Sequence, residues 1–325
     1  GIVSMVQAID PDIVHLHWIT GGFVRVEELS KIKRPIVWSL HDMWAFSGGC
    51  HYDGDCGRYQ KRCGACPVLG STREKDLSRW IFKRKQKHSS RIENLTINGL
   101  SRWLADCAEL SHLFQNRKVV NLPNPIDTNV YKPLPKQQAK QILGLSCDKK
   151  HILFGAMNAT SDERKGLSEF VQALEHMLSN DIELAIFGSS EPENAPKFSF
   201  QAHYLGRLQD DISLRILYSA ADVMVVPSKQ ENLSNAIMES LACGTPVVGF
   251  DIGGNRDMVD HQNNGYLAKP YDEKDLAKGI DYVLAHSHFE LLSRNARTKV
   301  VQEFDSKVVV EKYFKLYNEI LYRNC

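Results

Sequence analysis

Two glutamates, Glu231 and Glu239, lie eight residues apart in a segment that runs from an apolar stretch into a predicted helix beginning near Ser234. On one continuous helix they would stand ~12 Å apart with about 80° of rotation between them. That exceeds the ~5 to 9.5 Å between the acid and base of a glycosidase. With Glu231 in the loop and Glu239 one turn into the helix, the carboxylates could instead hold a polyhydroxyl ligand at two points. The helix N-terminus would offer N–H groups and a positive dipole to a phosphate.

Strands and helices must position this turn, and the sequence supplies both in alternation. Short apolar runs alternate with longer helical patterns, which is typical of strands and crossover helices in a parallel sheet. Strands are predicted in the front half at 13–16, 36–40, 95–98 and 119–122, and in the back half at 151–154, 183–187, 203–205, 223–226, 247–250 and 266–268. A doubly wound domain has about six strands. The back half is therefore predicted to be complete, and the front half to lack its first strands.

A proline-rich segment at 123–135 separates the two halves. The missing N–H groups and fixed φ of its prolines exclude a long helix or a central strand. We expect an α/β protein with an incomplete N-terminal domain over 1–125 and a C-terminal domain over 126–304 that carries the two glutamates. A last helical pattern follows, and the region 305–325 is predicted to pack back on the N-terminal domain.

The composition is that of an ordinary globular protein. The chain has 325 residues, of which 43% are hydrophobic and 24% are charged, a length typical of about two domains. Its 40 Lys and Arg against 39 Asp and Glu leave a net charge of +1, which argues against a nucleic-acid partner. No apolar run approaches the ~20 residues that span a bilayer, and no secretory leader is expected ahead of the first domain. The predicted compartment is the cytoplasm.

The two glutamates, separated by seven residues and followed by ACGTPVV, resemble the E-x7-E signature of retaining glycosyltransferases with the GT-B fold, particularly family 4. The resemblance extends to SLHDMWAFSGGCHY at 39–52, NPID at 124–127, RKG at 164–166 and AADVMVVPS at 220–228. It implies two Rossmann-like domains facing a cleft, with the N-terminal domain truncated. It also implies that the donor is held mainly by residues 151–270.

The resemblance implies a role for each matching position. Glu239 would hold the ribose of a nucleotide sugar, and Glu231 the hydroxyls of the donor sugar. Lys165 would neutralise the leaving diphosphate, which an ammonium does well as a point charge. The other implied donor contacts are Gly155, which ends the first strand of this domain, and the backbone N–H groups of Asn232, Leu233 and Ser234.

The family also has an Arg directly after the glycine that corresponds to Gly155. This chain has Ala156 there, and Arg164 beside Lys165 is the candidate substitute. The implied reaction moves a sugar from a UDP- or GDP-sugar to a saccharide or lipid-linked acceptor with retained configuration, in polysaccharide or glycolipid assembly. Such chemistry needs leaving-group stabilisation more than a strong protein base. No metal or other cofactor is therefore expected for catalysis.

Histidines supply the implied contacts of the N-terminal domain. His41 follows the predicted strand 36–40 and resembles the family histidine that contacts the donor sugar. His15 and His17 alternate along an apolar segment and are interpreted as structural.

The alternatives to a transferase are a catalytically weak or silent fragment that binds sugar nucleotides, a nucleotide-sugar epimerase of the same fold, and a zinc-dependent interaction module.

Half of the eight cysteines fall within seventeen residues, with the spacing C-x5-C-x6-C-x2-C: Cys50, Cys56, Cys63 and Cys66. The final C-G-A-C-P can direct two thiolates at one tetrahedral ion. One interpretation is a structural zinc without a catalytic role, in which His51 could replace one ligand. The others are a reduced loop whose thiols pack together and a disulfide pair.

A basic segment at 79–91 carries six Lys or Arg and no acidic residue, with Trp80 among them. A helix of this kind can lie on an anionic membrane face, and the alternative is a solvated helix face. The resembled family often uses lipid-linked acceptors on the cytoplasmic leaflet. This implies peripheral contact with the inner membrane face.

Overall fold

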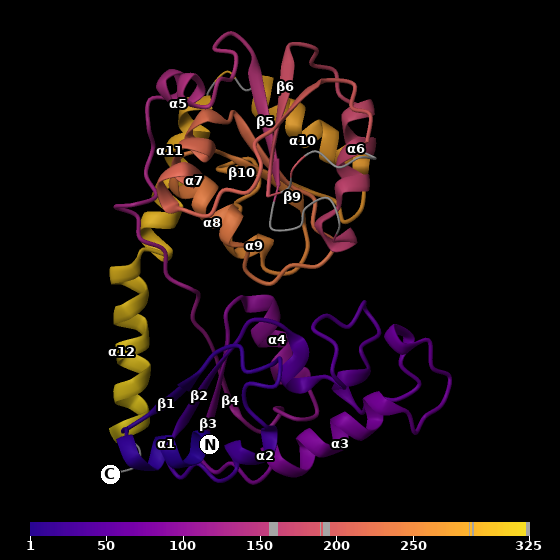
Figure 1. The fold of residues 1–325 in the computed structure, drawn as a ribbon, viewed down its shortest axis with the longest axis vertical. Helices are drawn as coiled ribbons and strands as arrows, with labels where there is room; N and C mark the ends of the chain where they lie inside the picture. The colour runs from indigo at the N-terminus through magenta and orange to yellow at the C-terminus, as the bar shows by residue number, and fades with distance from the viewer. Residues whose placement is uncertain (156–161, 189, 191–195, 286, 288, 323–325) are drawn as a thin grey trace. The chain divides into compact units, whose positions relative to one another are not determined.

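The computed structural model describes residues 1–155, 162–188, 190, 196–285, 287 and 289–322. The chain divides into two units, the first made of Gly1–Asn124 with Val310–Cys325 and the second of Pro125–Val309. Each unit is built on a parallel sheet with helices packed on it (Figure 1). The alternating strand and helix patterns of the sequence predicted this α/β class, and the structure confirms it.

The first unit contains a parallel sheet of four strands in the order β1-β2-β3-β4. The strands lie within one residue of their predicted bounds: β1 Val14–Leu16, β2 Ile36–Leu40, β3 Leu95–Gly99 and β4 Lys118–Asn121. The helices of this unit are α1 Ile2–Ile9, α2 Val26–Leu29, α3 Leu77–Ser89 and α4 Arg102–Leu110. Every residue of β2 and β3 is buried, as expected for central strands of a parallel sheet covered on both faces.

The C-terminal helix α12, Ser306–Tyr322, belongs to the first unit from Val310 onward. Leu316 and Ile320 of this helix pack on Val37 of β2, and the three side chains form a small buried cluster. Figure 1 shows α12 in yellow along the sheet of the first unit. Because successive strand residues face opposite sides, Val37 meets α12 while its neighbours in β2 enter the main core of the unit.

The second unit contains a parallel sheet of six strands in the order β10-β9-β8-β5-β6-β7. The strands are β5 Lys150–Gly155, β6 Ile182–Phe187, β7 Gln201–Tyr204, β8 Val223–Val226, β9 Val247–Phe250 and β10 Gly265–Ala268. In chain order from the edge this is 3-2-1-4-5-6, the doubly wound arrangement. β5 and β8 are neighbours, and the strand order reverses between them. This place is the topological switch point of the sheet, and ligands of such sheets bind there, beyond the carboxyl ends of the strands.

Helices cover both faces of this second sheet (Figure 1). They are α5 Lys136–Ile142, α6 Leu167–Glu175, α7 Asp211–Ala220, α8 Asn235–Ala242, α9 Asn255–Met258, α10 Glu273–Ala285 and α11 Phe289–Glu303. The helix α8 follows β8 after a loop and begins next to the switch point. Across the described residues, no helix combines the length and the apolar character needed to cross a bilayer.

Candidate functional site

The loop that follows β8 begins at Pro227 and lies directly against the RKG turn. Gly166 has a φ of +75°, and a Cβ built on it would stand 1.9 Å from the carbonyl oxygen of Pro227. The N–H of Lys229 donates to the carbonyl of Arg164 at 2.8 Å. Only glycine permits both this conformation and this approach. The two loops therefore pack backbone against backbone at the switch point.

Lys165 and Glu231 meet on this surface. Nζ of Lys165 lies 2.9 Å from Oε2 of Glu231, and their side chains are 24% and 12% exposed. The turn after β9 holds the same glutamate from another side, since the N–H of Gly254 donates to the Glu231 carbonyl at 3.2 Å. Glu231 thus lies in the loop ahead of α8, and its carboxylate is paired with a cation.

Glu239 lies one turn into α8 and is paired with a phenol. Its Oε2 accepts a hydrogen bond from the hydroxyl of Tyr218 at 2.8 Å. Burial raises the pKa of Glu239 to about 7 against the effect of this hydrogen bond, and the nearby Asp211 raises it further. The switch point therefore carries one glutamate bound to an ammonium and another whose charge changes near neutral pH.

A small pocket opens at the switch point and is lined by Gly155, Lys165, Pro227, Ser228 and Ser234, among others. Ser234 is the N-cap of α8, and its side chain makes no capping hydrogen bond. Ser228 is 1% exposed, and its hydroxyl has no hydrogen-bond partner among the described residues. A buried polar atom without a partner calls for an explanation such as a ligand or water. Ser228 is not among the residues predicted from the sequence, where its signal is its position directly after the strand end.

The remaining predicted donor residues lie around the same loop. Asn232 and Leu233 are buried in it, at 3% and 8% exposure, just ahead of α8. Arg164 is bonded to Asp162 of its own turn at 2.6 Å, and its side chain is 46% exposed. Ala156 lies outside the described residues. The structure therefore brings Lys165 into contact with Glu231.

In the first unit, polar side chains gather where β1 and β2 end. Nε2 of His41 lies 3.1 Å from Nδ1 of His17, and burial lowers the pKa of both imidazoles. The carboxylate of Asp42 accepts hydrogen bonds from the Trp18 indole at 3.1 Å and from His51 at 2.7 Å. His17, which the sequence pattern suggests is structural, lies against the candidate His41 in the structure.

Comparison with known proteins gives a consistent family. Residues 148–286 match the family model described as Glycosyl transferases group 1. An uncharacterized glycosyltransferase of Methanocaldococcus jannaschii is 24% identical over 322 residues, which cover 94% of this chain and 75% of that protein. The N,N'-diacetylbacillosaminyl-diphospho-undecaprenol alpha-1,3-N-acetylgalactosaminyltransferase of Campylobacter jejuni is 28% identical over 182 residues, 54% of this chain. The region 148–286 of the second unit is therefore similar to the group 1 glycosyl transferases.

The fold of this chain matches solved structures of the GT-B class. HepE of Anabaena, solved in complex with UDP, is similar with a TM-score of 0.69 and 17% identity over 98% of this chain and 82% of that chain. The GT-B fold predicted from the sequence is thereby confirmed. The chain spans about half the length of the Campylobacter relative, of which the match covers 47%.

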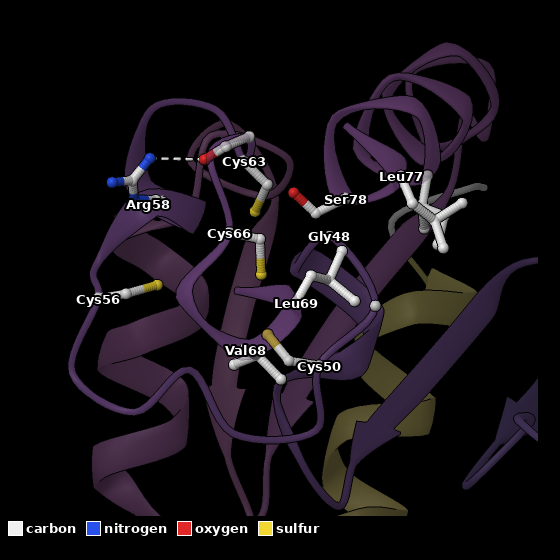
Figure 2. A pocket seen from close by; sticks show the side chains of 13 residues that line it. Gly48, Cys50, Cys56, Arg58, Cys63, Cys66, Val68, Leu69, Leu77 and Ser78 are labelled. Atoms are coloured by element: carbon white, nitrogen blue, oxygen red, sulfur yellow. Dashed lines mark hydrogen bonds between the residues drawn. The ribbon is translucent and has the colours of Figure 1, made fainter. Parts of the chain in front are cut away.

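The clustered cysteines line one cavity of about 210 Å³ in the first unit. All four are free thiols, and Figure 2 shows them around this cavity. Among the described residues, no three His, Cys, Asp or Glu side chains are grouped closely enough to hold a metal ion as they stand. His51, the alternative fourth ligand, is hydrogen-bonded to Asp42.

The basic segment forms most of α3, and half of its charge is used inside the first unit. Arg79 is paired with Glu74 at 2.7 Å, and Arg84 with Glu27. Lys85 is buried and donates to backbone carbonyls. The basic residues that face solvent are Lys83, Lys87 and Arg91, on a helix whose Trp80 is 59% exposed.

Proposed function

We propose that this chain is a retaining glycosyltransferase that moves a sugar from a nucleotide-sugar donor to an acceptor hydroxyl without a catalytic metal. The observation that carries the proposal is the contact between Lys165 and Glu231, 2.9 Å apart at the doubly wound switch point. It joins a cation suited to a diphosphate with a carboxylate suited to sugar hydroxyls, at the place where such sheets bind their ligands.

Two positive features would stabilise the departing diphosphate. Lys165 supplies a point charge, and the first turn of α8 supplies N–H groups that have no intrahelical acceptor. Negative charge grows on the phosphate oxygen as the bond to the sugar breaks, so prearranged positive groups lower the barrier. In a front-face reaction the departing phosphate accepts the proton of the acceptor hydroxyl. This chemistry requires neither a separate protein base nor a metal ion.

We assign Glu239 to the ribose of the donor and Glu231 to the hydroxyls of the transferred sugar. A carboxylate oxygen accepts hydroxyl hydrogen bonds strongly because it is charged. Tyr218 fixes the orientation of Glu239 through Oε2. The hydroxyl of Ser228, which has no partner among the described residues, adds a further polar group at the same pocket. In the first unit, His41 and His17 are the candidate contacts for a sugar.

The donor is proposed to be a UDP- or GDP-sugar, and the acceptor a saccharide or a lipid-linked saccharide. HepE, which shares the fold, was solved with UDP. The Campylobacter relative is named for transfer to a diphospho-undecaprenol-linked sugar. Exposed Trp80 with Lys83 and Lys87 on α3 would hold the enzyme at a cytoplasmic membrane surface that presents such an acceptor.

Thermal unfolding with UDP, GDP and ADP in metal-free buffer tests the donor site. A ligand present at one hundred times its dissociation constant stabilises the native state by about 2.7 kcal/mol. We expect one nucleotide to raise the Tm and Glu239→Ala to abolish the rise. Glu175→Ala, at the exposed end of α6, is the matched control and should keep it. Equal stabilisation of both variants would contradict the assignment of Glu239.

Incubation of the nucleotide sugar with saccharide acceptors tests the transfer itself. The proposal predicts a glycoside whose anomeric proton shows the configuration of the donor, formed equally well in chelator. A sugar epimer formed without any acceptor would identify an epimerase. Nucleotide binding with no product from a broad acceptor set would identify a silent binding protein.

A further inference from the structure

The segment 47–76 joins the polar end of β2 to α3 and contains almost no regular structure. Its helical parts are the 3-10 turns Arg58–Gln60 and Pro67–Leu69. Connections of this length without secondary structure are uncommon in folded domains and are usually either functional or disordered. The segment nevertheless buries Tyr59 and Cys63, which are 5% and 7% exposed.

The cavity within this segment is surrounded by sulfur. Figure 2 shows the thiols of Cys50, Cys56, Cys63 and Cys66 directed toward a common space. The backbone N–H of Gly48 hydrogen-bonds to the thiol of Cys63, and that of Arg58 to the thiol of Cys56. These two hydrogen bonds hold two of the four thiols in place at the cavity.

The backbone between the last two cysteines adopts a turn that ordinary residues disfavour. Gly64 has a φ of +138°, and Ala65 has a φ of +46°. A positive φ at alanine is uncommon and is retained where the surroundings require it. The N–H of Cys66 donates to the carboxylate of Asp76 at 2.8 Å, which fixes the far side of the turn. The result is that two thiols separated by two residues face the same cavity.

A buried cation lies beside the sulfur cluster. Lys85 is 4% exposed, donates to the backbone carbonyls of Trp44 and Ser47, and forms no ion pair with a carboxylate of the described residues. Its Nζ also lies 3.8 Å from the centre of the Trp44 ring. A buried ammonium that has no ion-pair partner is costly. Four thiolates around a divalent ion would form an anionic centre next to it.

We propose that Cys50, Cys56, Cys63 and Cys66 bind one structural zinc ion that fixes the segment 47–76. Four thiolates suit the closed tetrahedral site of zinc. Binding would displace the four thiol protons into solvent, form four Zn–S bonds, and require no oxidant or reductant. The thiols do not stand at metal-ligand distance in the structure, so binding would turn the side chains toward the centre of the cavity. Lys85 would balance part of the charge.

Metal content of the full chain, purified under reducing conditions and cleared of loose ions, tests this site. We expect about one zinc per chain, measured by elemental mass spectrometry. The double variant C63S/C66S should lose it. C147S, a half-buried cysteine of the second unit, is the matched control and should retain it. Wild-type chain without stoichiometric zinc, stoichiometric iron in its place, or zinc retained by C63S/C66S would overturn the proposal.

A second measurement keeps the proposal testable if the double variant does not fold. The wild-type chain is grown with cobalt in place of zinc, and its absorption spectrum is recorded. Intense thiolate-to-cobalt charge-transfer bands with tetrahedral d–d bands are expected, and octahedral cobalt bands would overturn the assignment. A disulfide between pocket cysteines in freshly purified chain, seen by mass spectrometry of alkylated peptides, would also overturn it. None of these readouts depends on donor binding, so failure of the zinc site leaves the proposed transferase function standing.

Discussion

The hydroxyl of Tyr218 donates a hydrogen bond to the carboxylate of Glu239 at 2.8 Å, beside the switch point of the second unit. Tyr218 comes from α7 and Glu239 from α8, so the bond joins two helices through one buried pair. Burial favours the neutral acid of Glu239, whereas the phenol favours the carboxylate, and the pKa of Glu239 settles at about 7. The proposed ribose contact is therefore sensitive to pH in the neutral range.

Affinity for the donor should increase as the pH rises through about 7. Ribose hydroxyls donate more strongly to a carboxylate than to a carboxylic acid, so each pH unit below the pKa should weaken binding, by up to about tenfold. Calorimetric titration with the nucleotide sugar measures this effect, because its diphosphate has no terminal phosphate that titrates near neutrality.

The variant Tyr218→Phe is the control for this pH dependence. Removing the phenol hydroxyl removes a hydrogen bond that lowers the pKa of Glu239, so the midpoint of the affinity profile should move to higher pH. A profile with the same midpoint in wild type and variant would show that another group governs it.

Replacing Lys165 should slow transfer much more than it weakens donor binding. Lys165→Ala removes the charge that faces the departing diphosphate, and loss of one such electrostatic contact costs ~10² to 10³ in kcat. Steady-state kinetics with saturating donor measure the effect. Lys229→Ala is the matched control, because Lys229 lies in the neighbouring loop and pairs with Glu169 at 2.7 Å. A comparable loss of kcat in both variants would point to general disturbance of the loop.

The strands could be predicted from the sequence because buried parallel strands are continuous apolar runs. The observed bounds of Val223–Val226 and Val247–Phe250 equal the predicted ones. The edge strand Gln201–Tyr204 was predicted two residues late, at 203–205. It is polar and half-buried and pairs on one side only, so its sequence carries a weaker apolar signal.

The side-chain pairs of the site could not be predicted in the same way. Glu231 and Glu239 stand out because a loop and a helix start lie between them. Tyr218 carries no comparable signal, since its role depends on how α7 packs against α8. The contact of His17 with His41 depends on strand register, with His15 opposite Val37 in the β1–β2 pair, and the sequence of one strand does not give its register with the next.

His15 should make the stability of the first unit depend on pH. It is hydrogen-bonded to Tyr317 of α12 at 2.6 Å and to Ser39 at 2.8 Å, and burial lowers its pKa from 6.5 to about 4. The folded state therefore favours the neutral imidazole. This stabilisation is fully present above pH 6.5 and is lost as the pH falls toward about 4.

Chemical unfolding of the chain at a series of pH values measures this dependence. The variant His15→Gln keeps a polar side chain that cannot titrate, so the free energy of unfolding should fall less steeply between about pH 6.5 and about 4 than in wild type. His176→Gln, at the end of a helix in the second unit, is the control and should retain the wild-type slope. Equal slopes in all three chains would exclude His15 as the source.

Gly166→Ala should damage the donor site through the backbone. The added Cβ would stand 1.9 Å from the carbonyl oxygen of Pro227 at a φ of +75°, so the RKG turn and the loop after β8 must separate. Gly144→Ala is a matched control, because Gly144 has a φ of +67° and nothing within 4 Å of the added atom. Both variants should lose about 1 kcal/mol through the left-handed backbone. Only Gly166→Ala should also lose nucleotide binding, as measured by Tm in the presence of saturating nucleotide. If both variants bind nucleotide like wild type, the close packing of these two loops does not form the donor site.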